Sequence, residues 1–179
     1  MTRKIINFAL FQVVWFACVL SGKHQLPLVA LAASVAIVAV SLWMQSGRRL
    51  ANLRLLGLVA VIGFCVDSLN LRLGVFALND SPVLPYLCPV WLVALWAAFG
   101  TTLRGSLSWL AGRYWLSAAL GAVAGAASYL AGAKLGAVAL NPDRAFSTTV
   151  LVITWALILP LLVWLAHGRN APELLRQIP

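Results

Sequence analysis

Long uninterrupted runs of apolar residues, separated by short polar segments, make up most of this chain. The runs are about 17 to 27 residues long, the length with which an α-helix crosses roughly 30 Å of hydrocarbon at 1.5 Å per residue. They do not alternate between apolar and polar positions, as the strands of a transmembrane β-barrel would. We therefore predict an all-α, polytopic membrane protein with six transmembrane helices in one bundle, a single transmembrane domain over residues 1–179. The expected spans cover residues 5–22, 26–44, 55–78, 88–103, 114–140 and 148–167, and we detect no internal repeat by eye.

Composition supports a membrane protein, and the charges predict its orientation. Hydrophobic residues make up 63% of the chain and charged residues only 9%, with a mean hydropathy of +0.96, whereas soluble domains carry about 25% charged residues. The net charge of +9 comes from basic residues scattered between the apolar runs, so we expect no nucleic-acid partner. With both termini in the cytoplasm, nine of the 13 basic residues fall in cytoplasmic segments. The positive-inside rule therefore predicts the N-in, C-in orientation.

Four polar side chains within the spans form a candidate polar site. Ionisable groups inside a bilayer cost about 2.5 to 3.5 kcal/mol or more, so they tend to face the bundle interior and to be functional. Asp67 is the most deeply placed, and it shares a helix face with Asn70. Asp67 then needs a proton or a partner on another helix, and Lys134 is the best-placed charged candidate. Gln12 suits an interhelical hydrogen bond, whereas Arg72 and Lys134 are close enough to the outer interface to reach it as simple anchors.

A stripe of small residues runs along one face of the fifth span, at intervals of three or four residues. In lipid, small side chains let helices approach closely enough for van der Waals contact to hold them together. We therefore predict that this helix packs at the centre of the bundle, with a glycine-lined substrate path as the alternative. The stripe consists of Ser117, Gly121, Gly125, Ser128, Gly132 and Gly136.

No catalytic or metal-binding motif is recognisable, so we expect no metal and no cofactor. His24 and His167 fall at opposite ends of the membrane in the predicted topology and cannot serve one reaction centre. The cysteines lack the spacing of metal ligands. Cys18 and Cys88 fall near the same membrane face, which leaves a disulfide between them open. Whether the protein is an enzyme stays open, and the lack of a recognised catalytic motif favours a protein that is not one.

Aromatic residues gather in the fourth span and in the connector that follows it. Interface anchoring explains most of them, but Trp91 and Trp96 are candidates for lining a pocket. Our leading hypothesis is binding or translocation of a small amphiphile or lipid, with Asp67 and Asn70 at its polar head. Gln12, Trp91 and Trp96 would then contact its apolar part. The alternatives are an intramembrane lipid-modifying enzyme with Asp67 as general acid or base, and a non-catalytic assembly partner that binds such a membrane enzyme.

Four segments of the chain resemble the DUF2878 family of bacterial multi-pass membrane proteins. They read INFALFQVVWFACVL in the first span, VDSLNLRLGVF in the third, PVWLVALWAAFGTTL in the fourth and GAVAGAASYLAGAKLGA in the fifth. The family often has a proline after the glycine that matches Gly125, where this chain has Ala126. The resemblance implies a bacterial inner-membrane protein without an assigned reaction. It also implies a lipid-related role, because members are often found near genes for fatty-acid modification.

Overall fold

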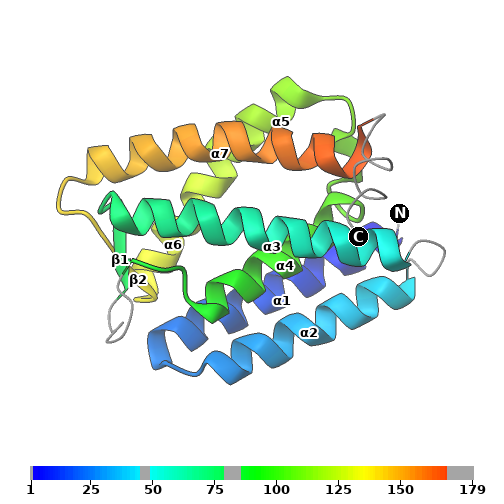
Figure 1. Cartoon of the computed structure of the whole chain (residues 1–179), viewed down its shortest axis with the longest axis horizontal. Coiled ribbons are helices and arrows are strands. Elements are labelled where there is room, and N and C mark those ends of the chain that lie inside the picture. The colour runs from blue at the N-terminus through cyan, green and yellow to red at the C-terminus, as the bar shows by residue number, and fades with distance from the viewer. Residues whose placement is uncertain (1, 45–48, 79–85, 169–179) are drawn as a thin grey trace.

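Helices account for most of the chain and form one bundle (Figure 1). The computed structural model describes residues 2–44, 49–78 and 86–168. The first half contains the helices α1 (Thr2–His24), α2 (Pro27–Met44) and α3 (Arg49–Arg72), and then the strand β1 (Phe76–Leu78). The second half contains α4 (Val90–Leu103), the 3-10 turn η2 (Ser108–Leu110), α5 (Tyr114–Leu120), the π-helical turn η3 (Gly121–Gly125), α6 (Ala126–Lys134), the strand β2 (Val138–Leu140) and α7 (Arg144–His167).

Four helices are long and apolar enough to cross a membrane. They are α1, α3, α7 and the continuous helix Tyr114–Lys134, which comprises α5, η3 and α6 and is called the α5–α6 helix below. The apolar helices α2 and α4 are shorter. The start of α1 and the end of α7 lie at the same end of the bundle (Figure 1).

The distribution of side chains is that expected of a bundle surrounded by hydrocarbon. Large apolar side chains point outward from the helices, including Leu28 (77% exposed), Trp115 (92%) and Val123 (73%). The interior holds polar groups as well as apolar ones, among them Asp67, which is fully buried. Buried carboxylates are rare in soluble proteins, where water surrounds the surface and apolar side chains fill the core. This arrangement supports a membrane environment.

Glycines end both α3 and α6 and direct the chain into the two strands. Gly74 has a φ of +67° and Gly136 a φ of +83°, a region of backbone conformation that favours glycine. After α3, the Gly74 N–H donates to Leu71 O at 3.1 Å and the Val75 N–H donates to Asn70 O at 2.9 Å. The same two bonds recur after α6. These Schellman caps stop the helices at residues 72 and 134, so our expected spans to residues 78 and 140 were too long.

The chain contains an internal repeat, so our expectation of none was wrong. LGVFALN at residues 73–79 matches LGAVALN at 135–141, and LVALWA at 92–97 matches LVITWA at 151–156. The strands pair in an antiparallel ladder in which Ala77 lies opposite Ala139, the equivalent residue of the other copy. The segments α3–β1–α4 and α5–α6–β2–α7 are therefore two copies of one helix–strand–helix unit, arranged about an approximate two-fold axis through this pair.

The centre of the bundle is occupied by α4, and our prediction of a central fifth helix was wrong. Helix α4 contacts α1, α2, α3 and α7, whereas the α5–α6 helix packs mainly against α7. The α5–α6 helix crosses the bundle obliquely on one side (Figure 1). Its small residues bring it close to a single neighbour, and the rest of its inner face lines a cavity.

Candidate functional site

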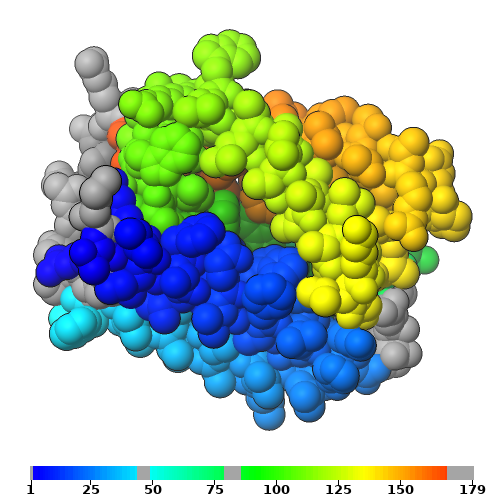
Figure 2. All heavy atoms as spheres, turned by 180° about the vertical axis from the view of Figure 1, so that it is seen from behind, coloured from blue at the N-terminus to red at the C-terminus, as the bar shows by residue number. Residues whose placement is uncertain are grey.

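A cavity of about 850 Å³ lies between α1 and the α5–α6 helix, with α4 and α7 behind it. Figure 2 shows the hollow from outside, bounded by α1 in blue and by the α5–α6 helix in yellow-green, with green atoms of α4 at its floor. Its lining extends along α1 from Lys4 to Val19, a length of about 22 Å at 1.5 Å per residue. The cavity therefore opens through the side of the bundle, where the surrounding surface is apolar.

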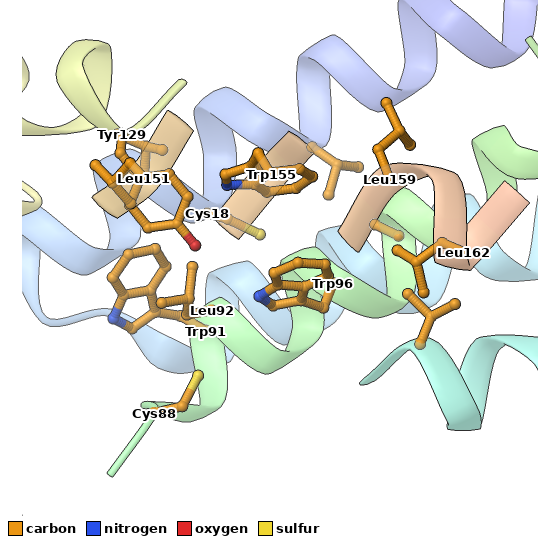
Figure 3. Close-up of a cluster of buried hydrophobic side chains, with 14 of the residues drawn as sticks. Cys18, Cys88, Trp91, Leu92, Trp96, Tyr129, Leu151, Trp155, Leu159 and Leu162 are labelled. Carbon is orange, nitrogen blue, oxygen red and sulfur yellow. The ribbon is translucent and has the colours of Figure 1, made fainter. Parts of the chain in front are cut away.

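Aromatic side chains dominate the wall of this lateral cavity. At its back, the indoles of Trp96 and Trp155 stack in parallel, with ring centroids 5.0 Å apart and an interplanar angle of 3°. Figure 3 shows the two rings one above the other, with Tyr129 and Trp91 beside them. The aromatic residues of the lining are Phe8, Phe11, Trp15, Trp91, Trp96, Phe99, Trp109, Tyr129 and Trp155. Such a wall offers a large apolar contact surface with few polar requirements.

Asp67 is held directly behind this wall by two of its aromatic residues. The Trp96 Nε1–H donates to Asp67 Oδ2 at 2.6 Å, and the Tyr129 hydroxyl donates to Asp67 Oδ1 at 2.6 Å. Both donors line the cavity, whereas Asp67 itself does not. Each carboxylate oxygen thus has a partner from another helix, as a buried charge requires. In this arrangement Asp67 positions the indole and the phenol.

The two repeats meet at this cluster. Asp67 and Tyr129 occupy equivalent positions 62 residues apart, as do Gly63 and Gly125, which precede them by four residues. A Cβ atom at Gly63 would collide with the Trp96 ring, and one at Gly125 would collide with the Trp155 ring. Each glycine therefore makes room for the tryptophan of its own unit, and the two tryptophans stack across the approximate two-fold axis.

The structure brings together only some of the residues that the sequence suggested. Gln12, Trp91 and Trp96 line the cavity. Asp67 and Asn70 are buried in α3 and lie outside the lining, so they are not placed to contact the head of a molecule in this cavity. The Asn70 Nδ2 makes no well-formed hydrogen bond to any residue that the structure describes. Lys134 is exposed at the end of α6, and the partners of Asp67 are uncharged aromatic donors instead.

The small residues of the fifth span pack against α7 at some positions and line the cavity at several. Cβ atoms at Gly121 and Gly125 would meet Trp155, so these glycines bring the helix against α7. A Cβ atom at Gly132 would meet nothing within 4 Å. Ser128, Gly132 and the two packing glycines all line the cavity. Ser117 is fully buried, and Gly136 belongs to the turn after the helix.

The cavity marks a difference between the two repeat units. Helix α3 contacts α7 directly, whereas the equivalent pair, the α5–α6 helix and α4, has the cavity between its members. Two cavity-lining positions of the α5–α6 helix carry smaller side chains than their equivalents in α3: Gly121 replaces Val59, and Ala124 replaces Ile62. A π-helical turn also interrupts this helix at Gly121–Gly125, and such turns often occur at functional sites.

The cysteines do not form the disulfide that the topology left open. Cys18 and Cys88 are both buried free thiols. The Cys18 Sγ lies 3.5 Å from the Ser34 Oγ of α2, within hydrogen-bond distance. Among the residues that the structure describes, no group of three His, Cys, Asp or Glu side chains is placed to hold a metal ion.

Sequence reasoning missed several residues of the site. Tyr129 and Trp155 had a usable signal, because each lies at the repeat equivalent of a residue already singled out, Asp67 or Trp96. The α1 residues Phe8 and Trp15 had no such signal, since an aromatic residue on a lipid-facing surface looks the same in a sequence as one that faces a cavity.

The fold and the site define a class: polytopic helical proteins with helices long and apolar enough to span a membrane and an aromatic cavity open at the side. The chain belongs to the DUF2878 family of proteins of unknown function, whose family model matches residues 4–161. All residues that line the cavity, from Lys4 to Leu159, fall within this match. No curated protein and no solved structure matches the chain.

Proposed function

We propose that this protein binds a membrane amphiphile in the lateral cavity. The observation that carries the proposal is the cavity itself, about 850 Å³ in volume and lined by nine aromatic residues. A volume of this size lies within the range of small-molecule sites, roughly 300 to 1,000 Å³. The cavity also opens through an apolar side of the bundle, so an acyl or isoprenoid chain can enter from the lipid without crossing water.

The proposed setting is the inner membrane of a bacterium. In this proposal all six apolar helices, the four long ones and the shorter α2 and α4, span the membrane, and both termini lie in the cytoplasm. The excess of basic residues in the segments assigned to the cytoplasm supports this orientation. The common position of the start of α1 and the end of α7 agrees with an even number of spans (Figure 1). In this orientation Lys4 marks the cytoplasmic end of the cavity and Val138 the opposite end.

Binding is better supported than catalysis by Asp67. The Asp67 carboxylate is fully buried, and both of its oxygens accept hydrogen bonds from side chains that separate it from the cavity. A general acid or base must come within about 2.6 to 3.2 Å of the group it serves, or reach it through one water molecule. Asp67 would need both Trp96 and Tyr129 to move before it could approach a substrate.

The proposal is tested by filling the cavity at one glycine and comparing a second glycine outside it. Neither Gly132, in the lining, nor Gly57, on an exposed part of α3, has an atom within 4 Å of an added Cβ. Both changes to leucine should therefore preserve the fold. Native mass spectrometry of the purified proteins should find an amphiphile bound to the wild type and to Gly57→Leu, and strongly reduced binding to Gly132→Leu.

Two results would contradict the proposal. Equal amphiphile retention by Gly132→Leu and Gly57→Leu would place the bound molecule elsewhere on the apolar surface. A second protein chain retained by the wild type and lost from Gly132→Leu would show that the cavity receives a transmembrane helix, as the assembly-partner hypothesis requires.

A further inference from the structure

The polar groups of the cavity differ at its two ends. Near Val138, the polar side chains of the lining are already engaged: Tyr129 and Trp96 donate to Asp67, and the Ser128 hydroxyl donates to Gly125 O at 2.7 Å. An occupant therefore meets mainly aromatic and aliphatic surface there, with no charged group among the described lining residues. This end of the cavity suits an apolar tail.

The opposite end of the lining includes a lysine and a serine, Ser106, whose buried hydroxyl has no hydrogen-bond partner among the described residues. The backbone of Ser106 is fixed to α1, because its N–H donates to Asn7 Oδ1 at 2.9 Å. Lys4 lies three residues before Asn7 and lines the same end of the cavity. Lys4 and Ser106 therefore line the same end of the cavity.

The charge of the lining is of one sign. Among the described residues that line the cavity, Lys4 is the one charged residue, and none carries a carboxylate. Gln12 follows on α1, about 12 Å deeper into the membrane at 1.5 Å per residue. Its amide is a polar group in the wall of the cavity along which the tail would lie. Along α1 the lining thus begins with a cationic residue, and Gln12 follows among aromatic side chains.

We propose that the occupant is an amphiphile with an anionic headgroup, which binds at Lys4 and Ser106 while its tail extends past Gln12 and Trp96 toward Val138. This inference rests on the proposed function and adds to it the chemical class and the orientation of the ligand. A carboxylate and a phosphate both satisfy it, since each offers charged oxygen acceptors to an ammonium and a hydroxyl donor.

The test compares three brominated probes in nanodiscs of phosphatidylcholine at alkaline pH. The probes are a dibrominated fatty acid, the alkyl phosphate with the same tail, and the methyl ester of the acid. Bromine quenches tryptophan fluorescence on contact, so saturable quenching reports occupancy of the cavity beside Trp96 and Trp155. The variants are Lys4→Gln, Ser106→Ala and the matched control Lys23→Gln. Lys23 is an exposed lysine at the other end of α1 that does not line the cavity.

At least one anionic probe should half-saturate the wild type at a lower mole fraction than the ester. Lys4→Gln and Ser106→Ala should each raise that value for the anion about tenfold or more, as expected for the loss of one hydrogen bond to a charged group. The ester should respond to neither change, and Lys23→Gln should leave all three probes unaffected. The anion that binds more tightly identifies the headgroup.

Equal binding of the acid, the phosphate and the ester would overturn the anionic class while leaving amphiphile binding intact. The same holds if Lys4→Gln and Lys23→Gln weaken the anions alike, because the effect would then come from general surface charge. Failure of all three probes to quench in a saturable manner would instead remove the proposed function itself.

Discussion

Removing the Tyr129 hydroxyl tests how Asp67 is held at the meeting point of the two repeats. Tyr129→Phe keeps the ring, which packs against Phe76 with centroids 5.4 Å apart, and deletes only the donor to Asp67 Oδ1. A fully buried carboxylate oxygen then has one partner fewer. The expected loss in the free energy of unfolding is about 1.5 to 3 kcal/mol, the range for a hydrogen bond to a charged group. Tyr114→Phe, at an exposed tyrosine, should change it by less than about 0.5 kcal/mol.

The proteins are unfolded in mixed micelles by titration with SDS, and tryptophan fluorescence reports the unfolding. Tyr129→Phe and Tyr114→Phe are each measured alone and again in an Asp67→Ala background. Without the carboxylate, the Tyr129 hydroxyl has lost its acceptor, so Tyr129→Phe should cost at least about 1 kcal/mol less than in the wild type. An equal cost of Tyr129→Phe in both backgrounds would refute the reasoning, because it would show that the hydroxyl does not act through Asp67.

Three further predictions concern the packing around the site, each measured by the same titration. Gly63→Ala and Gly125→Ala should each destabilise the protein by about 1 to 3 kcal/mol, because the added methyl group collides with a tryptophan ring. Gly57→Ala, where an added Cβ meets nothing within 4 Å, should be neutral or stabilising. An equal effect at all three sites would contradict the packing. Gly74→Ala and Gly136→Ala should each lower the free energy of unfolding by about 1 to 2 kcal/mol, because both glycines have a positive φ. Unchanged stability of these variants would rule out the two Schellman caps. Ser147→Ala should lower the free energy of unfolding by about 1 to 3 kcal/mol, because it removes the hydroxyl that donates to Val75 O at 2.6 Å. A loss below about 0.5 kcal/mol would show that this bond between Ser147 and Val75 contributes little.

The helical class of the protein and the approximate positions of its helices could be predicted, because a membrane demands long apolar runs and the sequence displays them directly. The ends of α3 and α6 could not be placed from hydrophobicity alone. Val75 and Phe76 are as apolar as the helix before them, and the stop depends on the backbone conformation of Gly74. The motif shared by residues 73–79 and 135–141 would have drawn attention to this turn.

The site was harder to predict than the fold. The depth of Asp67 correctly indicated a partner on another helix, but a search for opposite charge led to Lys134. Trp96 and Tyr129 are donors without charge, and their relation to Asp67 follows from the pairing of the two repeat units. The cavity itself depends on how far the α5–α6 helix lies from α4, a distance that no local pattern encodes. The small residues of that helix were visible in the sequence, but their two different neighbours were not.

The central claim, that the lateral cavity binds an amphiphile, is tested most directly by photolabelling. A fatty acid or alkyl phosphate with a diazirine in its tail would be crosslinked to the protein in nanodiscs, and the labelled peptides identified by mass spectrometry. We predict labelling of cavity-facing residues of α1, α4 and the α5–α6 helix, such as Trp15, Leu95 and Ala124, with competition by the unlabelled amphiphile and loss in Gly132→Leu. Labelling spread over the outer faces of α2 and α3, without competition, would contradict the claim.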